Sequence, residues 1–123
     1  MRIFLIDDDM TVVQNLTLFL QADFHAVSWL TFVPDRCLLI EAMEDFEPDG
    51  VVLDYGMERT GTEICDWIHG WKPEMPIVFY TSYAGSAHER EQMLRKVSED
   101  CIIAKRETGA DVDTILATVR SLQ

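Results

Sequence analysis

The sequence has few cysteines, few basic residues and no long hydrophobic run. Its three cysteines, Cys37, Cys65 and Cys101, are widely spaced and form no Cys-x-x-Cys motif, which argues against a disulfide framework or a structural zinc site. Ten Lys and Arg stand against 22 Asp and Glu, a formal net charge of −12, so direct binding to nucleic acid is disfavoured. The apolar start, Met1 to Ile6, is followed at once by acids. We therefore expect no signal peptide, no membrane span and a cytoplasmic protein.

The chain has enough apolar residues to form one hydrophobic core. The chain has 123 residues, 48% of them apolar, so we expect a single domain over residues 1–123. Short apolar runs alternate with segments whose apolar residues recur at spacings of three and four, which indicates strands alternating with amphipathic helices. The expected strands are residues 3–6, 26–30, 51–53, 77–80 and 101–104, and the expected helices are about residues 10–22, 34–46, 61–70, 86–97 and 110–122.

Capping residues and apolar spacing give more detailed expectations for three of these helices. Asp9 is expected to cap the first helix, whose buried face includes Phe19. Pro34 is expected in the first turn of the second helix, which should bury Leu38. The fourth helix has few strong apolar anchors, Leu94 among them, so we expect it to be loosely held.

Five strands alternating with five helices predict an α/β fold with a doubly wound parallel sheet and helices on both faces. The pattern alone does not fix the order of the strands. Polar residues stand where several strands end, and in an open parallel sheet this carboxyl edge is where ligands bind. If the first, third, fourth and fifth strands are neighbours, one pocket collects these residues: Asp7, Asp8, Asp54, Thr81 and Lys105.

Three carboxylates in one pocket favour a cation, because like charges at short range raise each other's pKa. Oxygen ligands of this kind suit Mg²⁺, which binds through one or two carboxylates together with phosphate oxygens. An aspartate beside such a metal can attack a phosphoryl group and form an aspartyl phosphate. Lys105 and the Thr81 hydroxyl would then contact the transferred phosphoryl oxygens.

The ordered set of strand endings resembles a known family. An acid pair after the first strand, one aspartate after the third, a Thr-Ser pair after the fourth and a lysine after the fifth are similar to the receiver domain of two-component response regulators. The resemblance covers nearly the full length. It implies a flavodoxin-like fold with five parallel strands in the order 2-1-3-4-5. It also implies phosphorelay signalling through Mg²⁺-dependent phosphorylation of an aspartate.

The resemblance assigns a role to each residue of the pocket, and one backbone carbonyl joins the metal ligands. The roles are Asp54 as phosphoacceptor and metal ligand, Asp8 as a direct Mg²⁺ ligand, Asp7 as an acid acting through bound water, the Gly56 carbonyl as a further metal ligand, and Thr81 and Lys105 as switch residues.

The chain departs from the family pattern at several positions. Glu58 stands about where the family has a proline, and Gly61 comes one residue early after the phosphoacceptor. Arg106 replaces the proline that normally follows the lysine in a cis linkage, and a cis bond without proline costs about 3 to 4 kcal/mol. The placement of Lys105 is therefore open. Ile102 occupies the position of the aromatic switch residue, so we expect altered transmission of the signal.

Two other functions are compatible with parts of the sequence. A receiver-like binding module would signal by contact without phosphate, which Ile102 and Arg106 favour. Residues Asp7 to Thr11 also resemble the opening motif of haloacid-dehalogenase-type phosphohydrolases, with Asp7 as nucleophile and Asp9 as general acid. That family needs a further acidic pair after a later strand, which is not found after Lys105, and it gives Asp54 no role.

The resemblance also indicates partners. The phosphodonor would be a histidine kinase or a histidine phosphotransfer protein, and the output would be a downstream protein or a domain outside these residues. Neither nucleic acid nor membrane is an expected direct partner. A homodimer through the face formed by residues 86–97, 101–104 and 110–122 is left open. We expect no enzyme activity beyond self-phosphorylation from a phosphodonor and autodephosphorylation.

Overall fold

The computed structural model describes residues 1–123 and contains one sheet of five parallel strands. The strands lie in the order β2-β1-β3-β4-β5, so the predicted fold class and order are confirmed. β1 and β3 pair with Ile6 opposite Leu53, and β4 and β5 pair with Thr81 opposite Ala104. The strands are β1 (Arg2–Ile6), β2 (Ala26–Leu30), β3 (Gly50–Leu53), β4 (Ile77–Thr81) and β5 (Ile102–Ala104).

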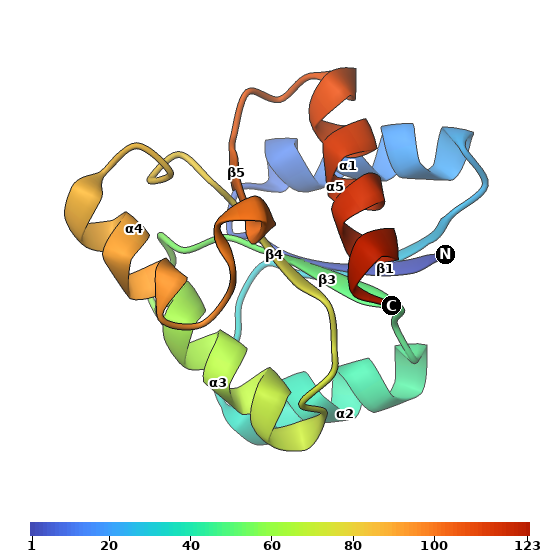
Figure 1. The fold of residues 1–123 in the computed structure, drawn as a ribbon. Coiled ribbons are helices and arrows are strands. Elements are labelled where there is room, and N and C mark those ends of the chain that lie inside the picture. The colour runs from blue at the N-terminus through green and yellow to red at the C-terminus, as the bar shows by residue number, and fades with distance from the viewer.

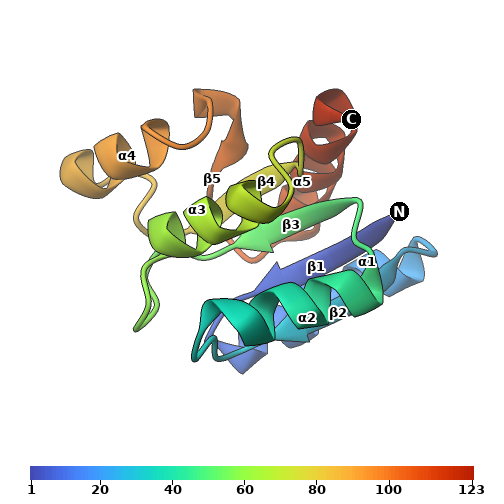
Figure 2. The ribbon, with the colours of Figure 1, turned by 90° about the horizontal axis from the view of Figure 1, so that it is seen from below.

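Five α-helices cover both faces of the sheet. α1 and α5 lie on one face, and α2 and α3 lie on the other, with α4 beside α3 (Figures 1 and 2). A short 3₁₀ turn, η1 (Glu99–Cys101), precedes β5. The helices are α1 (Met10–Ala22), α2 (Arg36–Phe46), α3 (Gly61–Trp71), α4 (Ala87–Leu94) and α5 (Gly109–Leu122).

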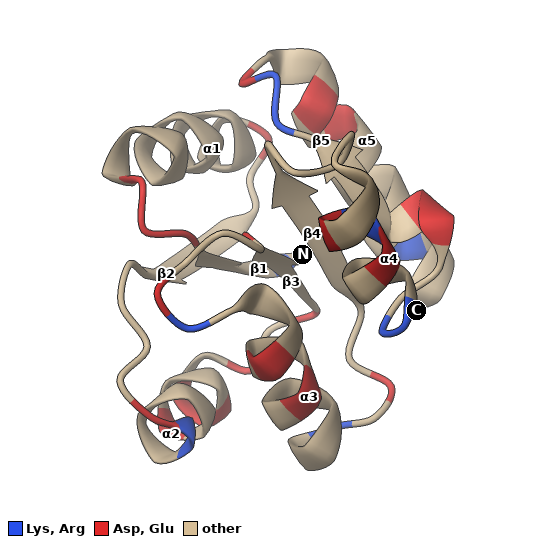
Figure 3. Cartoon of the chain, turned by 90° about the vertical axis from the view of Figure 1, so that its left-hand side faces the viewer, with Lys and Arg blue, Asp and Glu red and all other residues tan.

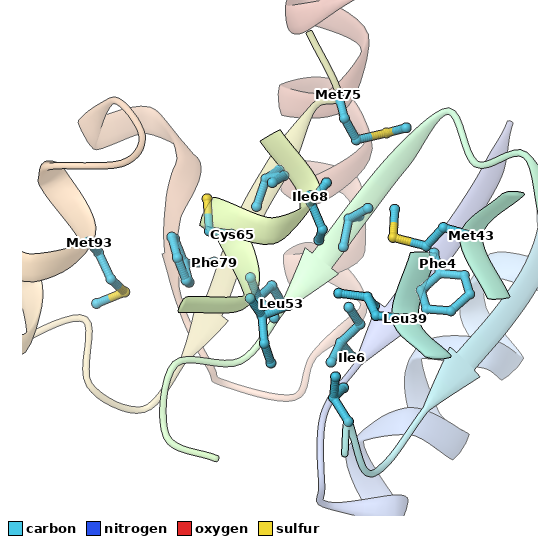
Figure 4. Packing of buried hydrophobic residues seen from close by; sticks show 14 of the residues in the cluster. Phe4, Ile6, Leu39, Met43, Leu53, Cys65, Ile68, Met75, Phe79 and Met93 are labelled. Carbon is cyan, nitrogen blue, oxygen red and sulfur yellow. The ribbon is translucent and has the colours of Figure 1, made fainter. Parts of the chain in front are cut away.

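Alternation along the strands divides the core between the two faces. Ile3 and Leu5 contribute to a cluster of 13 buried residues under α1 and α5, while Phe4 and Ile6 contribute to a cluster of 16 on the other face (Figure 4). Because successive side chains of a strand point to opposite faces, the uninterrupted apolar runs of β1, β3 and β4 fill both clusters. The three central strands are thereby buried on both faces, and they position the residues that come directly after them.

Helix starts follow the capping side chains. The Asp9 carboxylate accepts a hydrogen bond from the Thr11 N–H, so the predicted cap is confirmed. The second helix begins at Arg36, after the predicted first-turn position of Pro34. Asp35 is its cap and accepts from the Leu38 N–H at 2.8 Å. The position of this capping carboxylate therefore sets the helix start, and the expectation for Pro34 was wrong.

Some apolar side chains expected in the core are exposed. Phe19, Leu38 and Leu94 retain 46%, 40% and 44% of their accessible surface. Each lies at the margin of a helical stripe, where spacing of three and four does not separate the core face from its border. In α4 this leaves Met93 as the only buried residue, which agrees with the expectation of a weakly anchored helix.

Acidic residues, red in the cartoon of Figure 3, outnumber the basic residues, which are blue, along the chain. All three cysteines are free. The helices are all too short or too polar to cross a bilayer.

Candidate phosphoacceptor and metal site

The candidate site begins with two aspartates at the ends of neighbouring strands. Asp7 follows β1 and Asp54 follows β3, and the Asp54 N–H donates to the Ile6 carbonyl at 2.9 Å, which continues the strand pairing. Asp7 and Asp54 are buried, with 4% and 6% of their surface exposed, while Asp8 is exposed. One carboxylate oxygen from each of the three lies within 4.8 Å of the others. The sheet thus gathers three carboxylates at its carboxyl edge.

Lys105 reaches this cluster from β5 although β4 lies between β5 and β3. Its Nζ lies 2.8 Å from Asp7 Oδ2 and 3.5 Å from Asp54 Oδ2. No peptide bond in the chain is cis, so Lys105 takes this position with a trans bond to Arg106. With a trans bond at this position, the Lys105 ammonium therefore still reaches the carboxylates of Asp7 and Asp54.

Burial and neighbouring charges shift the pKa values of Asp7 and Lys105. Desolvation by burial raises the pKa of Asp7 above its ordinary value of 3.8, and the hydrogen bonds from Lys105 and the Asp9 N–H only partly oppose this. Burial alone would lower the pKa of Lys105, but its hydrogen bond to Asp7 and the charges of Asp54 and Asp7 raise it above 10.5. Lys105 is therefore a cation at neutral pH and the natural partner for added negative charge.

The hydroxyl of Thr81 lies at the end of β4, fully buried. Its Oγ1 accepts a hydrogen bond from the Tyr83 N–H at 3.1 Å, and its carbonyl accepts from the Lys105 N–H at 3.0 Å. Gly56 comes two residues after Asp54, and its N–H donates to Asp54 Oδ1 at 3.4 Å. A Cβ at Gly56 would lie 2.4 Å from the Tyr83 ring, so a side chain there would displace this tyrosine.

A groove of about 450 Å³ opens beside Asp8, between the loop after β2 and the loop after β3. Arg59 joins the two loops, since its guanidinium donates to the Pro34 carbonyl at 2.9 Å and to Glu63 at 3.1 Å. The exposed Asp8 carboxylate is thus approachable from solvent, while Asp7 and Asp54 lie deeper.

The donor set suits a small divalent cation. The carboxylates offer hard oxygen ligands of the kind that Mg²⁺ prefers, and the single ammonium of Lys105 balances only one of three formal negative charges. Asp7, Asp8 and Asp54 lie close enough together to hold one ion, directly or through bound water. The residues present therefore fit the metal that the sequence predicts.

The structure separates one predicted residue from the site and adds a buried pair beside it. The Asp9 side chain turns to the start of α1 as a cap, which leaves the phosphohydrolase alternative without its general acid.

Tyr80 and Asp111 form a buried hydrogen bond at 2.7 Å, and the sequence did not lead us to expect it. Tyr80 stands in an apolar run, and Asp111 lies four residues before Ile115 on the buried face of α5. An acid on an apolar helix face is the signal that could have revealed the pair.

Comparisons with known proteins agree with this geometry. The chain matches no curated protein sequence significantly. Among solved structures, a CheY-like receiver domain protein from Methanospirillum hungatei has a TM-score of 0.81 at 20% identity, covering 98% of this chain and 94% of that one. A receiver domain protein from Clostridium thermocellum has a TM-score of 0.75 at 22% identity, with the same coverage of 98% and 94%. At these identities the likeness supports the fold alone.

A third structure, the N-terminal signal receiver domain of a two-component system response regulator from Bacteroides fragilis, has a TM-score of 0.78 at 21% identity and covers 96% of this chain and 95% of that one. The family described as the response regulator receiver domain matches residues 3–117, which is most of the chain. The chain therefore belongs to the response regulator receiver domain family.

Proposed function

We propose that residues 1–123 form one phosphoacceptor receiver domain in which Mg²⁺-dependent phosphorylation of Asp54 switches the binding of a partner. Receiver domains are generally signalling modules and typically use a metal. The observation that carries the proposal is the position of Asp54, buried at the end of β3 with Asp7, Asp8 and the Lys105 ammonium around it. This arrangement combines a nucleophile with the charges that a phosphoryl group requires.

The chemistry assigned to Asp54 is transfer of a phosphoryl group from a donor. One carboxylate oxygen of Asp54 forms a bond to phosphorus, the bond from phosphorus to the leaving group breaks, and the leaving group takes the bonding electron pair and a proton. Mg²⁺ held by Asp8, by Asp54, by the Gly56 carbonyl and through water by Asp7 would neutralise phosphoryl oxygens. The Lys105 ammonium lies 3.5 Å from Asp54 Oδ2 and would pair with a further phosphoryl oxygen. Thr81 would donate its hydroxyl to another.

The proposed phosphodonor is a histidine kinase or a histidine phosphotransfer protein, acting in the cytoplasm. The proposed output is a change in binding to a downstream protein or to another domain, and the domain is not an enzyme beyond self-phosphorylation and autodephosphorylation. A receiver-like module that signals without phosphate is the second candidate. Ile102 favours it, because an aliphatic side chain occupies the buried position of the aromatic switch residue.

Labelling by a small phosphodonor tests the proposal. The protein is incubated with Mg²⁺ and phosphoramidate, and the intact protein is weighed. We expect one phosphoryl group on the native chain and none on Asp54→Asn, whose amide cannot form an acyl phosphate. Asp9→Asn is the matched control and should label normally, because Asn caps a helix about as well as Asp.

Each candidate function predicts a different result. No mass change in the native chain would support the phosphate-independent module. Loss of labelling in Asp9→Asn with normal labelling in Asp54→Asn would refute the assignment of Asp54. Repeated release of phosphate without a stable product would indicate a hydrolase.

A further inference from the structure

Outside the acidic cluster, two buried polar side chains connect β4 to α5. The Tyr80 hydroxyl donates to Asp111 Oδ2 at 2.7 Å, and the two residues are 1% and 5% exposed. Burial and the hydrogen bond to Asp111 raise the pKa of Tyr80, so the phenol stays protonated and remains a donor. A buried polar pair of this kind is costly unless its groups are satisfied, so the partners of both side chains matter.

Those partners are the backbone groups directly after Lys105. The Arg106 N–H donates to Asp111 Oδ2 at 2.9 Å, and the Glu107 N–H donates to the Tyr80 hydroxyl oxygen at 2.9 Å. The Lys105 N–H itself donates to the Thr81 carbonyl of β4 at 3.0 Å. Three consecutive amides are therefore bonded to β4, or to the side-chain pair that joins β4 to α5.

The backbone in this segment adopts a conformation that needs such support. Glu107 has φ of 58°, in the left-handed region, which is unfavourable for a residue with a side chain. Strained backbone of this kind persists where the surrounding structure determines it. Here the hydrogen bonds to Asp111 and Tyr80 hold the backbone of residues 106 and 107. Residue 106 is an arginine, so no proline ring restricts the backbone after Lys105.

The same tyrosine also lies beside the Lys105 ammonium. Its ring centroid is 6.0 Å from Lys105 Nζ, and the same Nζ pairs with Asp7 and Asp54. A lysine side chain loses rotamer entropy when it is fixed. Hydrogen bonds that fix the backbone at and after Lys105, together with the ring beside its ammonium, reduce the number of directions in which the ammonium can point.

We infer that Tyr80 and Asp111 are positioning residues for Lys105. They hold the backbone after Lys105 so that its ammonium meets the phosphoryl group on Asp54, an inference that rests on the proposed phosphorylation of Asp54. In this chain they do so across a trans Lys105–Arg106 bond. Tyr80 and Asp111 affect the site by positioning Lys105, and they do not contact the phosphoryl group themselves.

Binding of beryllofluoride with Mg²⁺, which mimics the phosphoryl group, tests this inference in a double-mutant cycle. Tyr80→Phe keeps the ring and removes the hydroxyl, and we expect about five- to tenfold weaker binding, the size of one lost hydrogen bond. Asp111→Asn should have a smaller effect, because its amide oxygen can still accept from the Arg106 N–H. In a Lys105→Met background, Tyr80→Phe should cause no further loss, because the residue through which it acts is gone.

Tyr55→Phe is the matched control. Tyr55 lies on the other side of the site, against Tyr83, and its hydroxyl makes no hydrogen bond within the chain, so this variant should bind beryllofluoride normally. A loss in Tyr80→Phe that is equally large with Lys105 and with Met at position 105 would overturn the inference and indicate a general structural role. Undiminished binding in Tyr80→Phe would overturn it as well.

A second readout separates this inference from the proposed function. NMR of the ¹⁵N-labelled lysine ammonium groups reports the Lys105 contact with Asp7 without any phosphoryl mimic. The Lys105 signal should shift in Tyr80→Phe and stay unchanged in Tyr55→Phe. If the native chain binds no beryllofluoride, the proposed function fails, while an unchanged Lys105 signal in Tyr80→Phe refutes the positioning role.

Discussion

Gly61 lies where the first turn of α3 passes over the backbone of Asp54. A Cβ at Gly61 would lie 2.5 Å from the Asp54 carbonyl oxygen and 2.8 Å from the Tyr55 Cα, and neither backbone atom can rotate away. Gly61→Ala should therefore lower the free energy of unfolding by about 1 to 3 kcal/mol. It should also slow labelling of Asp54, because relief of the overlap displaces the end of β3. Urea denaturation and phosphoramidate labelling measure the two effects.

Gly70 provides a control in the same helix. A Cβ there would meet only the end of the Arg36 side chain at 4.0 Å. Because Ala is favoured over Gly inside a helix by up to about 1 kcal/mol, Gly70→Ala should be neutral or stabilising and should label normally. Equal stability of the two alanine variants would show that α3 does not approach Asp54 closely.

At the scale of single residues, the sequence predicts the residues at strand ends better than the contacts that cross the core. Asp7, Asp54 and Lys105 each come directly after an apolar run, so their place at one edge of the sheet results from the parallel arrangement. The Tyr80–Asp111 hydrogen bond joins residues 31 positions apart. A tyrosine inside an apolar run looks like ordinary core, and only the packing of α5 against β4 selects its partner.

Among the α-helices, α4 has the fewest buried residues, and it follows the loop that begins after Thr81. It has eight residues, of which only Met93 is buried. Thr81 Oγ1 accepts from the Tyr83 N–H, so movement of this hydroxyl toward a phosphoryl group would change a bond at the start of the loop that leads into α4. Ile102 is shorter than tyrosine and has no hydroxyl, so a large exchange of its position is not expected.

Beryllofluoride with Mg²⁺ should therefore alter amide exchange mainly between Tyr83 and Val97. The start of α5 is held by Asp111 and Tyr80, so exchange in α5 should change little. Hydrogen exchange measured by mass spectrometry reports on both segments. Thr81→Ala should still bind beryllofluoride but lose the response. An equal response in α5, or a full response in Thr81→Ala, would contradict this route.

Element boundaries show where local pattern reaches its limit. Most strand and helix positions were predicted closely because periodicity is a local property, but the fourth helix, expected to reach about residue 97, ends at Leu94. The start of α2 was not predicted either, because the Asp35 cap decided it. Phe19 was assigned to the core by spacing, yet it lies near Gly109 at the start of α5 with 46% of its surface exposed. Spacing places a residue near a face but does not report how far the neighbouring element covers it.

For the whole molecule, the pattern of alternating elements predicts a parallel sheet but not the order of its strands. The order 2-1-3-4-5 was expected from family resemblance, and the structure has it. Strand order depends on long-range packing of helices against two faces, and short apolar runs such as those of β1 and β3 do not distinguish their neighbours. The strand-end cluster depends on that order, since only adjacent β1 and β3 bring Asp7 and Asp54 together.

The net charge of −12 and the carboxylate cluster together predict how Mg²⁺ affects stability. An ion that binds only the folded chain stabilises it by mass action, about 1.4 kcal/mol at ten times the dissociation constant, so millimolar Mg²⁺ should raise the melting temperature at matched ionic strength. Asp8→Asn should lose most of this gain. Asp113→Asn removes an exposed charge from α5 and should keep it.

The pH dependence of that gain is set by Asp7. Its pKa is raised in the folded chain, so the folded state holds this proton more tightly than the unfolded state. Stability without metal should therefore fall as the pH rises from about 4 through the folded pKa of Asp7. Mg²⁺ is bound more tightly when Asp7 is ionised, so the gain in melting temperature should decrease as the pH falls through the folded pKa of Asp7. A gain in melting temperature that is equal in Asp8→Asn and the native chain would place the ion outside the cluster.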